Sequence, residues 1–316
     1  MSACDRVVLL VGGVGGAKLA LGLARVLPPN ALTIIVNTGD DFEHLGLHIS
    51  PDLDTVMYTL ADLANPQTGW GLAGDTFRAM EMVGRYGGPT WFRLGDGDLG
   101  TNVMRTMLLR EGCSLTEVTQ WLCAALGIAH RLLPMSDDPV RTVLETEQGR
   151  LAFQEYFVRE RWQPVVRGIC YEGAEQANPS PAVAAALEEA TAIVLGPSNP
   201  FLSIDPILAV PGIRERIAAS TAPKVAVTPL IAGQAVKGPT AKLMAELGLE
   251  VSVLGVARHY QELLSGIILD EADRSLIPSI EALGIRATAR HTYMETLSDK
   301  ISLAQSLLAW LEDNLP

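Results

Sequence analysis

The sequence lacks the features of a membrane, exported or nucleic-acid-binding protein. Its longest apolar runs, such as Val7–Val11 and Ala192–Leu195, are far shorter than the roughly 20 residues that cross a bilayer. The N-terminal stretch MSACDRVVLL has neither a cationic segment nor a cleavage site, so we expect a cytoplasmic protein without a signal peptide. With 24 basic and 36 acidic residues the formal charge is −12, which opposes general binding to nucleic acid.

Several motifs of known chemistry are also missing. The four cysteines show no C-x-x-C spacing, which argues against disulfides and a zinc cluster. The five histidines do not form H-E-x-x-H, no G-x-S-x-G nucleophile elbow is present, and no Walker A loop occurs. The sequence therefore favours neither zinc hydrolysis nor covalent serine catalysis.

Short apolar runs alternate with helical patterns along the chain. This alternation predicts a single α/β domain over residues 1–316, with a Rossmann-like, mainly parallel sheet and helices on both faces. The expected strands are Val7–Val11, Leu32–Val36, Ala192–Leu195, Lys224–Thr228, Glu250–Leu254 and Ile267–Leu269.

Two segments depart from this alternation. Residues 50–125 are mostly helical, with breaks at 87–89 and 94–100, and we interpret them as a smaller helical insertion over the sheet. Residues 139–172 contain an alternating run and a Gln-Gly turn, which indicate an antiparallel excursion.

The first candidate site is the glycine turn GGVGGA at 12–17, which follows an apolar strand and precedes an amphipathic stretch. Glycine permits close backbone approach, and a helix that begins there offers free N–H groups to a phosphate. The spacing matches the dinucleotide pattern G-x-G-x-x-G only loosely, so a tight turn without a ligand is the alternative.

The second candidate is the acidic stretch after Leu32–Val36. Asn37, Asp40 and Asp41 follow a strand end, where ligands bind in open α/β sheets, and Asp52 and Asp54 precede a helical run. Carboxylates near a phosphate turn suit Mg²⁺. The alternative is that Asp52 or Asp54 caps a helix that begins at Thr55.

Two further loops carry polar groups. WFRLGDGDLG at 91–100 offers Trp91 and Phe92 to a flat ring and Arg93 to an anion, with Asp96 and Asp98 in a glycine-rich loop. GPSNP at 196–200 follows another strand, so its serine and asparagine also lie at a strand end. A structural turn is the competing interpretation of each loop.

Taken together, these segments resemble one family. In chain order, GGVGGAKLALGL, VNTGDD, SPDLDTVMY, WGLAGDTF, WFRLGDGDL, LLPMSDDPV and GPSNP look like the 2-phospho-L-lactate transferase family of coenzyme F-420 biosynthesis. Further matches in VAVTPLIAGQAVKGPTAKLM and LGVARHYQELL extend the resemblance over nearly the whole chain.

The resemblance implies a transferase that requires Mg²⁺. Members of this family move a phosphorylated three-carbon acid (lactate-, enolpyruvate- or glycerate-derived) from a GDP-linked donor to the ribityl hydroxyl of 7,8-didemethyl-8-hydroxy-5-deazariboflavin and release GMP. The family also implies a Rossmann-like fold, an insertion that contributes to the acceptor site, and a homodimer.

The resemblance also implies roles for individual residues. Asp54, expected to be catalytic, and Arg93 match positions that contact the deazaflavin, and Asp40 and Asp54 are the expected metal ligands. The residues expected to bind the donor nucleotide are Gly12, Gly13, Gly15, Gly16, Lys18, Asn37, Ser198, Asn199 and Pro200.

One motif departs from the family pattern LGDRDLATH. This chain has Gly97 in place of the cation and Asn102 in place of the histidine. If that cation touches the donor, the departure bears on which three-carbon group is used, although Arg105 or Arg93 could compensate.

Two other functions remain open from the residues. A nicotinamide-dependent oxidoreductase could use the same glycine turn, although Asn37 stands where a ribose-binding acid would be expected. A non-catalytic nucleotide-binding regulator is the second alternative, and the clustered aspartates speak against a purely passive role.

Overall fold

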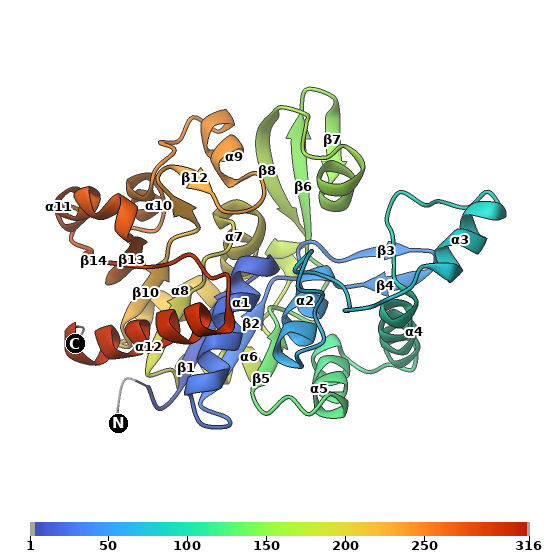
Figure 1. The fold of residues 1–316 in the computed structure, drawn as a ribbon, viewed down its shortest axis with the longest axis horizontal. Coiled ribbons are helices and arrows are strands. Elements are labelled where there is room, and N and C mark those ends of the chain that lie inside the picture. Colours follow the sequence, from blue (N-terminus) through green and yellow to red (C-terminus); the bar gives the residue numbers. More distant parts are fainter. Residues whose placement is uncertain (1–3, 315–316) are drawn as a thin grey trace.

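A computed structural model describes residues 4–314 as a parallel sheet covered on both faces (Figure 1). All seven strands of the sheet are parallel. Their spatial order is β14 (Arg286–Arg290), β13 (Gly266–Asp270), β10 (Lys224–Val227), β9 (Ala192–Leu195), β1 (Val7–Val11), β2 (Leu32–Val36) and β5 (Arg131–Pro134).

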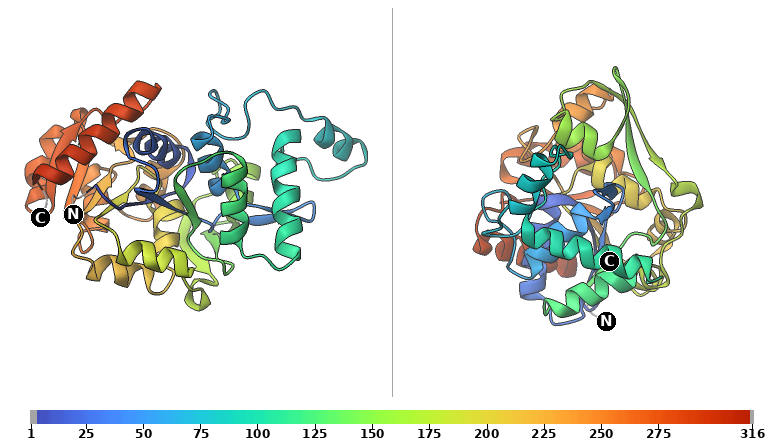
Figure 2. Two further views of the ribbon diagram at one scale, coloured as in Figure 1. Left: turned by 90° about the horizontal axis from the view of Figure 1, so that it is seen from below. Right: turned by 90° about the vertical axis from the view of Figure 1, so that its right-hand side faces the viewer.

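The central strands are apolar throughout because both faces of the sheet are covered. Residues of β1 alternate between two cores, with Leu9 in one and Leu10 in the other. One face is covered by α1 (Gly13–Val26), α2 (Pro51–Leu60), α5 (Leu115–Ala125) and α12 (Leu297–Asn314). The other is covered by α6 (Pro181–Glu188), α7 (Asp205–Leu208), α8 (Ile213–Ala219), α9 (Thr240–Glu246), α10 (Val253–His259) and α11 (Ile277–Glu281). Figure 2 shows the sheet between these layers.

The strand order fixes where a ligand site is expected. From β1 the chain moves outward to β2 and β5, and from β9 it moves outward the other way to β10, β13 and β14. Strands β1 and β9 are neighbours, so the direction of winding reverses between their carboxyl ends. In open α/β sheets such a switch point is the usual place for a ligand.

Two excursions leave the sheet. The segment predicted as a helical insertion, residues 50–125, contains α2 and α5, which pack on the sheet, and α3 (Arg78–Arg85) and α4 (Asp96–Arg110), which extend beyond it with the hairpin β3 (Phe42–His44) and β4 (Leu47–Ile49). Between residues 141 and 172 the chain forms an antiparallel sheet of β6 (Arg141–Thr146), β7 (Gly149–Ala152) and β8 (Val166–Glu172). In Figure 1 this sheet and the insertion extend from different sides of the parallel sheet.

The remaining elements are short. They are the hairpin β11 (Leu230–Ile231) and β12 (Gln234–Ala235), two π-helical turns at Glu155–Arg159 and Pro200–Ile204, and two 3₁₀ turns at Ala174–Gln176 and Glu271–Leu276.

The α/β prediction is confirmed, but three details of the strand and loop predictions differ. The predicted strand Glu250–Leu254 is wrong: Ser252 caps α10, because its side chain accepts a hydrogen bond from the Gly255 N–H at 3.0 Å. The predicted break at 94–100 is limited to Leu94 and Gly95, since α4 begins at Asp96. Strands β5 and β14 were not predicted, because their short sequences RLLP and RATAR carry charged residues and no long apolar run.

No helix among residues 4–314 is both long and apolar enough to span a membrane.

One glycine of α1 sets how closely the helix approaches the loop after β9. A Cβ added at Gly15 would lie 2.3 Å from the carbonyl oxygen of Pro197. Gly100, also inside a helix, has nothing within 4 Å of such a Cβ. Alanine substitutions at the two positions therefore separate the effect of steric contact on stability from the effect of helix propensity.

We expect Gly15→Ala to lower the free energy of unfolding by about 1–3 kcal/mol, because the backbone of the Pro197 loop must move. Gly100→Ala should raise it by roughly 0.5–1 kcal/mol through helix propensity alone. Urea unfolding of both variants measures the difference. Equal stabilisation by the two substitutions would contradict this account of the glycine turn.

Candidate functional site

The glycine turn and the GPSNP loop meet at the switch point. The Gly12 N–H donates to Ser198 Oγ at 3.1 Å, and this hydroxyl donates to the Gly12 carbonyl at 2.8 Å. A Cβ at Gly16 would lie 2.6 Å from Ser198 Oγ. The absence of side chains in the turn is therefore needed for packing between β1 and β9, whether or not a ligand is bound.

Asn199 combines a structural role with a free donor. Its Oδ1 accepts hydrogen bonds from the Phe201 and Leu202 N–H groups at 3.0 and 3.1 Å, so it caps the turn that begins at Pro200. Its Nδ2 is buried and has no hydrogen-bond partner among the described residues. A buried donor without a partner costs free energy, and a ligand group could satisfy it.

Asp52 links the glycine turn to the end of β2. Its Oδ1 accepts from the Gly13 N–H at 2.7 Å, and its Oδ2 accepts from Asn37 Nδ2 at 2.9 Å. Asn37 Nδ2 also lies 3.3 Å from Asp40 Oδ1. The predicted donor-site residues Gly12, Gly13, Asn37 and Ser198 thus lie together, and Asp40 and Asp52 join them.

The alternative that Asp52 or Asp54 caps a helix beginning at Thr55 is wrong. Helix α2 begins at Pro51, so Asp52 and Asp54 lie inside its first turn rather than before it. Asp52 instead caps α1, a neighbouring helix, through Gly13. A carboxylate is favourable at that position because the N-terminal end of a helix carries a partial positive charge.

The carboxylates beside Asn37 carry more negative charge than their surroundings balance. Burial raises the pKa of Asp40 well above its usual value, and the nearby Asp52 and Asp41 carboxylates raise it further. Burial also raises the pKa of Asp52 to about 6. Within residues 4–314, neither Asp40 nor Asp52 forms an ion pair with a lysine or arginine. A cation would be stabilised here.

Asp54 lies in a second cluster, between α2 and α4. Arg105 is 1% exposed and holds both carboxylate oxygens of Asp54, one of them at 3.1 Å. Four residues along α2, Tyr58 donates to Asp98 Oδ1 at 2.8 Å. Tyr58 was not among the predicted site residues, although residues four apart share a helix face.

The metal-ligand prediction fits Asp40 better than Asp54. Both oxygens of Asp54 are engaged by Arg105, which leaves little room for an ion there. No three His, Cys, Asp or Glu side chains in the described part of the chain converge on an ion site. Mg²⁺ usually takes only one or two protein carboxylates and completes its shell with water and substrate phosphate, so Asp40 and Asp52 are the side chains that suit it.

The departure from the family motif at Asn102 lies inside the protein. Asn102 is fully buried, its Nδ2 donates to the Asp98 carbonyl at 2.9 Å, and its Oδ1 accepts from Arg105 at 2.6 Å. Gly97 is exposed at the start of α4, and its N–H donates to Asp75. Asn102 therefore acts on Arg105, and through it on Asp54.

Arg93 and its aromatic neighbours form a third region. The Arg93 guanidinium lies over the Phe77 ring at 4.2 Å, beside a groove of about 320 Å³. Trp91 and Phe92 pack against Phe42, with ring centroids 6.1 and 4.8 Å away, so these two rings have partners within the protein. The groove is lined by Phe77, Met80, Glu81, Gly84, Thr90 and Arg93.

Lys18 lies on α1 and donates to the Met294 carbonyl at 2.6 Å.

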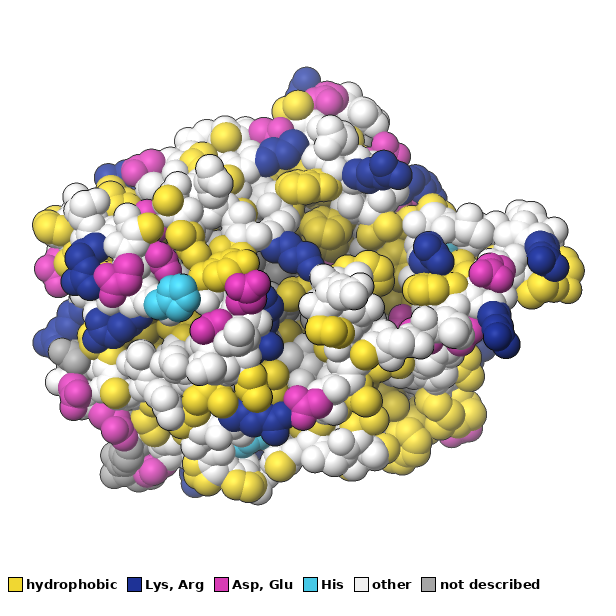
Figure 3. Space-filling model, in the orientation of Figure 1, with side chains coloured by type: hydrophobic (Ala, Val, Ile, Leu, Met, Phe, Trp, Pro, Cys, Tyr) yellow, Lys and Arg dark blue, Asp and Glu magenta, His cyan; other side chains and the backbone are white. Residues whose placement is uncertain are grey.

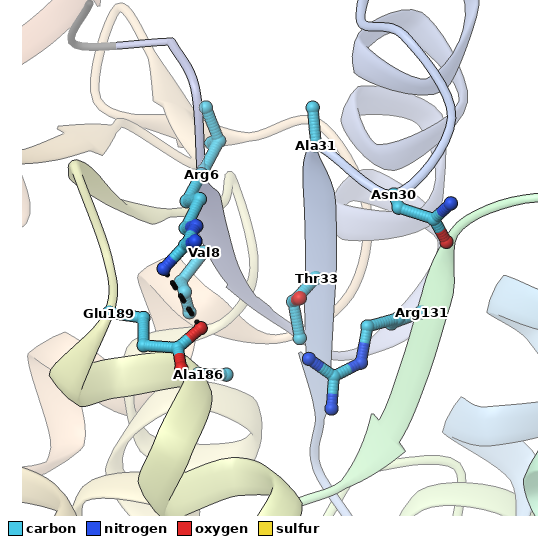
Figure 4. Close-up of a pocket in the computed structure, with 9 residues that line it drawn as sticks. Arg6, Val8, Asn30, Ala31, Thr33, Arg131, Ala186 and Glu189 are labelled. Carbon is cyan, nitrogen blue, oxygen red and sulfur yellow. Dashed lines mark hydrogen bonds and ion pairs between the residues drawn. The ribbon is translucent and has the colours of Figure 1, made fainter. Parts of the chain in front are cut away.

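Another cavity, of about 120 Å³, opens at the opposite end of the parallel strands, where β1 and β2 begin (Figure 4). There Arg6 pairs with Glu189 at 3.1 Å. None of the predicted site residues lines that cavity.

The carboxyl group of Asp98 allows a test of the second cluster. Burial raises its pKa to about 7, and the Asp54 carboxylate acts in the same direction. The group titrates near pH 3.9 in an unfolded chain. Because the folded state binds the proton more tightly, this stabilisation is complete below about pH 4 and is lost as the pH rises through about 7.

We expect the free energy of unfolding of the wild type, relative to Asp98→Asn, to fall by about 2–4 kcal/mol between about pH 4 and pH 8. Urea unfolding at a series of pH values measures this difference. A difference that does not change with pH would mean that Asp98 titrates normally.

Comparisons with known proteins agree on one family. The sequence profile of the family described as 2-phospho-L-lactate transferase CofD matches residues 7–291. A phosphoenolpyruvate transferase of Streptomyces griseus is 43% identical over 314 residues, covering 98% of this chain and 99% of that protein. A 2-phospho-L-lactate transferase of Methanosarcina mazei is 41% identical over 298 residues, covering 94% of this chain and 98% of that protein.

The fold has a counterpart among solved structures. A protein of the UPF0052 family from Bacillus halodurans superposes with a TM-score of 0.62 at 18% identity, covering 96% of this chain and 98% of the other. At this identity the similarity concerns the fold. The family follows from the profile match and the full-length relatives: this chain belongs to the 2-phospho-L-lactate transferase CofD family.

Proposed function

We propose that this chain is a transferase of coenzyme F-420 biosynthesis. It moves a phosphorylated three-carbon acid from a GDP-linked donor to the ribityl hydroxyl of 7,8-didemethyl-8-hydroxy-5-deazariboflavin. Membership of the CofD family supports a transferase, and the similar proteins are named for phosphoenolpyruvate and 2-phospho-L-lactate transfer. The observation that carries the proposal is the convergence of the glycine turn, Asn37, Asp40 and Asp52 at the switch point.

The reaction exchanges one phosphorus–oxygen bond for another. The acceptor hydroxyl oxygen forms a bond to the β-phosphorus of the donor, the bond from that phosphorus to GMP breaks, and GMP leaves with the electron pair. The hydroxyl proton passes to a carboxylate or to water. Such transfers depend mainly on alignment and charge neutralisation, so the protein contributes by positioning both substrates.

Mg²⁺ is the cofactor of this proposal. It would neutralise charge on the donor diphosphate, and Asp40 and Asp52 would hold it. The burial of Asp40 and the excess of carboxylates around Asn37 support this assignment. Because Asn37 donates to both carboxylates, it keeps them oriented toward one another when no ion is bound.

The acceptor would bind on the side of the insertion. Asp54 and Arg93 are the proposed contacts with the deazaflavin. Arg105 and Asn102 hold Asp54 in one orientation, so the carboxylate is in place before the acceptor binds. The groove lined by Arg93 and Phe77 is an open space that could receive part of a ring system.

The proposal assigns a small-molecule donor and acceptor, a cytoplasmic location and a homodimer as its working state. The excess of acidic residues agrees with substrates held by local groups rather than by a broad basic surface. The three-carbon acid that is transferred is identified by supplying each of the three GDP-linked donors in turn.

The acceptor assignment predicts the effect of two substitutions. Arg93→Ala and Asp54→Asn should each reduce the rate of transfer by about 100-fold or more, because the acceptor hydroxyl loses its alignment. Asp62→Asn is the matched control, since Asp62 lies just after α2 and pairs with Arg25 in an exposed ion pair. A steady-state assay of GMP release measures the rates.

Asp54→Asn leaves Arg105 without its carboxylate, so circular dichroism and a thermal melt must show that the variant is folded at the assay temperature. Unchanged turnover in both folded variants would refute the acceptor site.

The metal assignment predicts coupled binding. Mg²⁺ should strengthen GDP binding by about tenfold or more in the wild type, and this gain should disappear in Asp52→Asn and Asp40→Asn. Asp62→Asn should keep the gain. Calorimetric titration of GDP with and without Mg²⁺ measures it, and NADH in a parallel titration should not bind. Binding of NADH in place of GDP would favour an oxidoreductase.

A further inference from the structure

The KGPTAK segment at 237–242 lies close to the glycine turn. It follows the hairpin β11–β12 and leads into α9. Lys237 Nζ donates to the Thr68 carbonyl, in the loop after α2. A Cβ added at the neighbouring Gly69 would lie 2.7 Å from Val14 Cγ1 and 3.6 Å from Lys237 Nζ. Three distant parts of the chain therefore meet at the first turn of α1.

A second lysine reaches the same place from α1 itself. Lys18 is partly buried and Lys237 is exposed, and desolvation lowers the pKa of both ammonium groups. The positive charges of Lys300 and Lys237 lower the pKa of Lys18 further. Lys18 follows Val14 by one turn of α1, and both Val14 and Lys237 lie beside Gly69. Figure 3 shows basic side chains near the middle of this face, over the N-terminal end of α1.

The acidic groups nearby do not neutralise these lysines. Glu295 and Asp299 are the carboxylates that face Lys18, and Asp299 Oδ2 accepts from the Glu295 and Thr296 N–H groups at 3.2 and 2.7 Å. Within the described chain Lys18 and Lys237 form no ion pair, and each donates to a main-chain carbonyl. A chain of charge −12 thus keeps unneutralised cations beside the glycine turn.

The first N–H groups of the glycine turn are already used. The Gly12 N–H donates to Ser198, and the Gly13 N–H donates to Asp52. An anion at this helix end would also face the Asp52 carboxylate. Besides the Mg²⁺ of the proposed function, further cations are therefore needed to balance the charge of a diphosphate, and Lys18 and Lys237 are in position to supply them.

We propose that Lys237 joins Lys18, which is already expected to bind the donor, in a two-cation subsite, and that this subsite binds the phosphate oxygens of the donor's diphosphate. This rests on the proposed function for the identity of the donor. Diphosphate oxygens can accept from both ammonium groups, which stabilises two like charges that otherwise repel each other. Lys237 then links the segment after β12 to the bound nucleotide. Its hydrogen bond to the Thr68 carbonyl links the loop after α2 to the nucleotide as well.

The experiment titrates the full chain with inorganic pyrophosphate and with GDP, both in the presence of Mg²⁺. Lys237→Gln and Lys18→Gln should each weaken binding of both ligands by about 10-fold to 100-fold. Lys237→Arg should recover most of the affinity because it keeps the charge. The deazaflavin concentration that gives half-saturation should be the same in these three variants as in the wild type.

Lys224→Gln is the matched control. Lys224 is also a partly buried lysine that donates to one main-chain carbonyl, that of Ser220 at 2.5 Å, but it lies where β10 begins, at the opposite edge of the sheet. Its substitution should leave GDP and pyrophosphate binding unchanged.

The outcomes separate the two proposals. GDP binding that is equally tight in the wild type, Lys18→Gln and Lys237→Gln would overturn the lysine subsite and leave the GDP-linked donor standing. A wild type that binds neither GDP nor pyrophosphate would overturn the donor assignment and the subsite together. An equal loss in Lys224→Gln would also overturn the subsite, because it would show a general charge effect.

Discussion

The contact on which the site depends is the pair of hydrogen bonds made by the Asp52 carboxylate. One oxygen accepts from the Gly13 N–H and the other from Asn37 Nδ2. This single side chain therefore ties the first turn of α2 to the first turn of α1 and to the end of β2. Gly12 must be a glycine for the same reason, because a Cβ there would lie 2.3 Å from Asp52 Oδ2. The close packing that forms the site also concentrates its negative charge.

This concentration of negative charge explains why neighbouring carboxylates have different roles in the proposed mechanism. Asp40 is buried and Asp52 is partly buried, and neither forms an ion pair with a lysine or arginine among the described residues, so they are suited to a divalent ion that arrives with the donor. Asp54, only two residues further along α2, is neutralised by Arg105 and is suited to orient an uncharged hydroxyl. The first turn of α2 thus supplies Asp52 to the proposed donor site and Asp54 to the proposed acceptor site.

Much of this arrangement could be predicted from the sequence. Strands Val7–Val11, Leu32–Val36 and Ala192–Leu195 were predicted with their observed bounds, because buried parallel strands are uniform apolar runs between clear breaks. The polar groups at their carboxyl ends follow directly from that assignment. Strand β14 was missed because an edge strand has only one neighbour and tolerates the charged sequence RATAR.

The roles of single side chains were harder to predict, because they depend on contacts between distant segments. No local pattern shows that Asp52 caps α1 rather than its own helix, or that Asn102 holds Arg105. The 94–100 stretch was interpreted as a loop because of its glycines, yet Asp96 begins α4 there. The Asp96 carboxylate accepts from the Arg78 and Ala79 N–H groups at 3.1 and 3.0 Å, so it stabilises the start of α3.

The most direct test of the account is mass spectrometry of the deazaflavin after incubation with the purified chain, Mg²⁺ and each of the three GDP-linked donors in turn. The account predicts that at least one donor yields a deazaflavin whose mass has increased by one phosphorylated three-carbon acid, with an equal amount of GMP. An unmodified deazaflavin with all three donors, in the presence of folded protein, would contradict it.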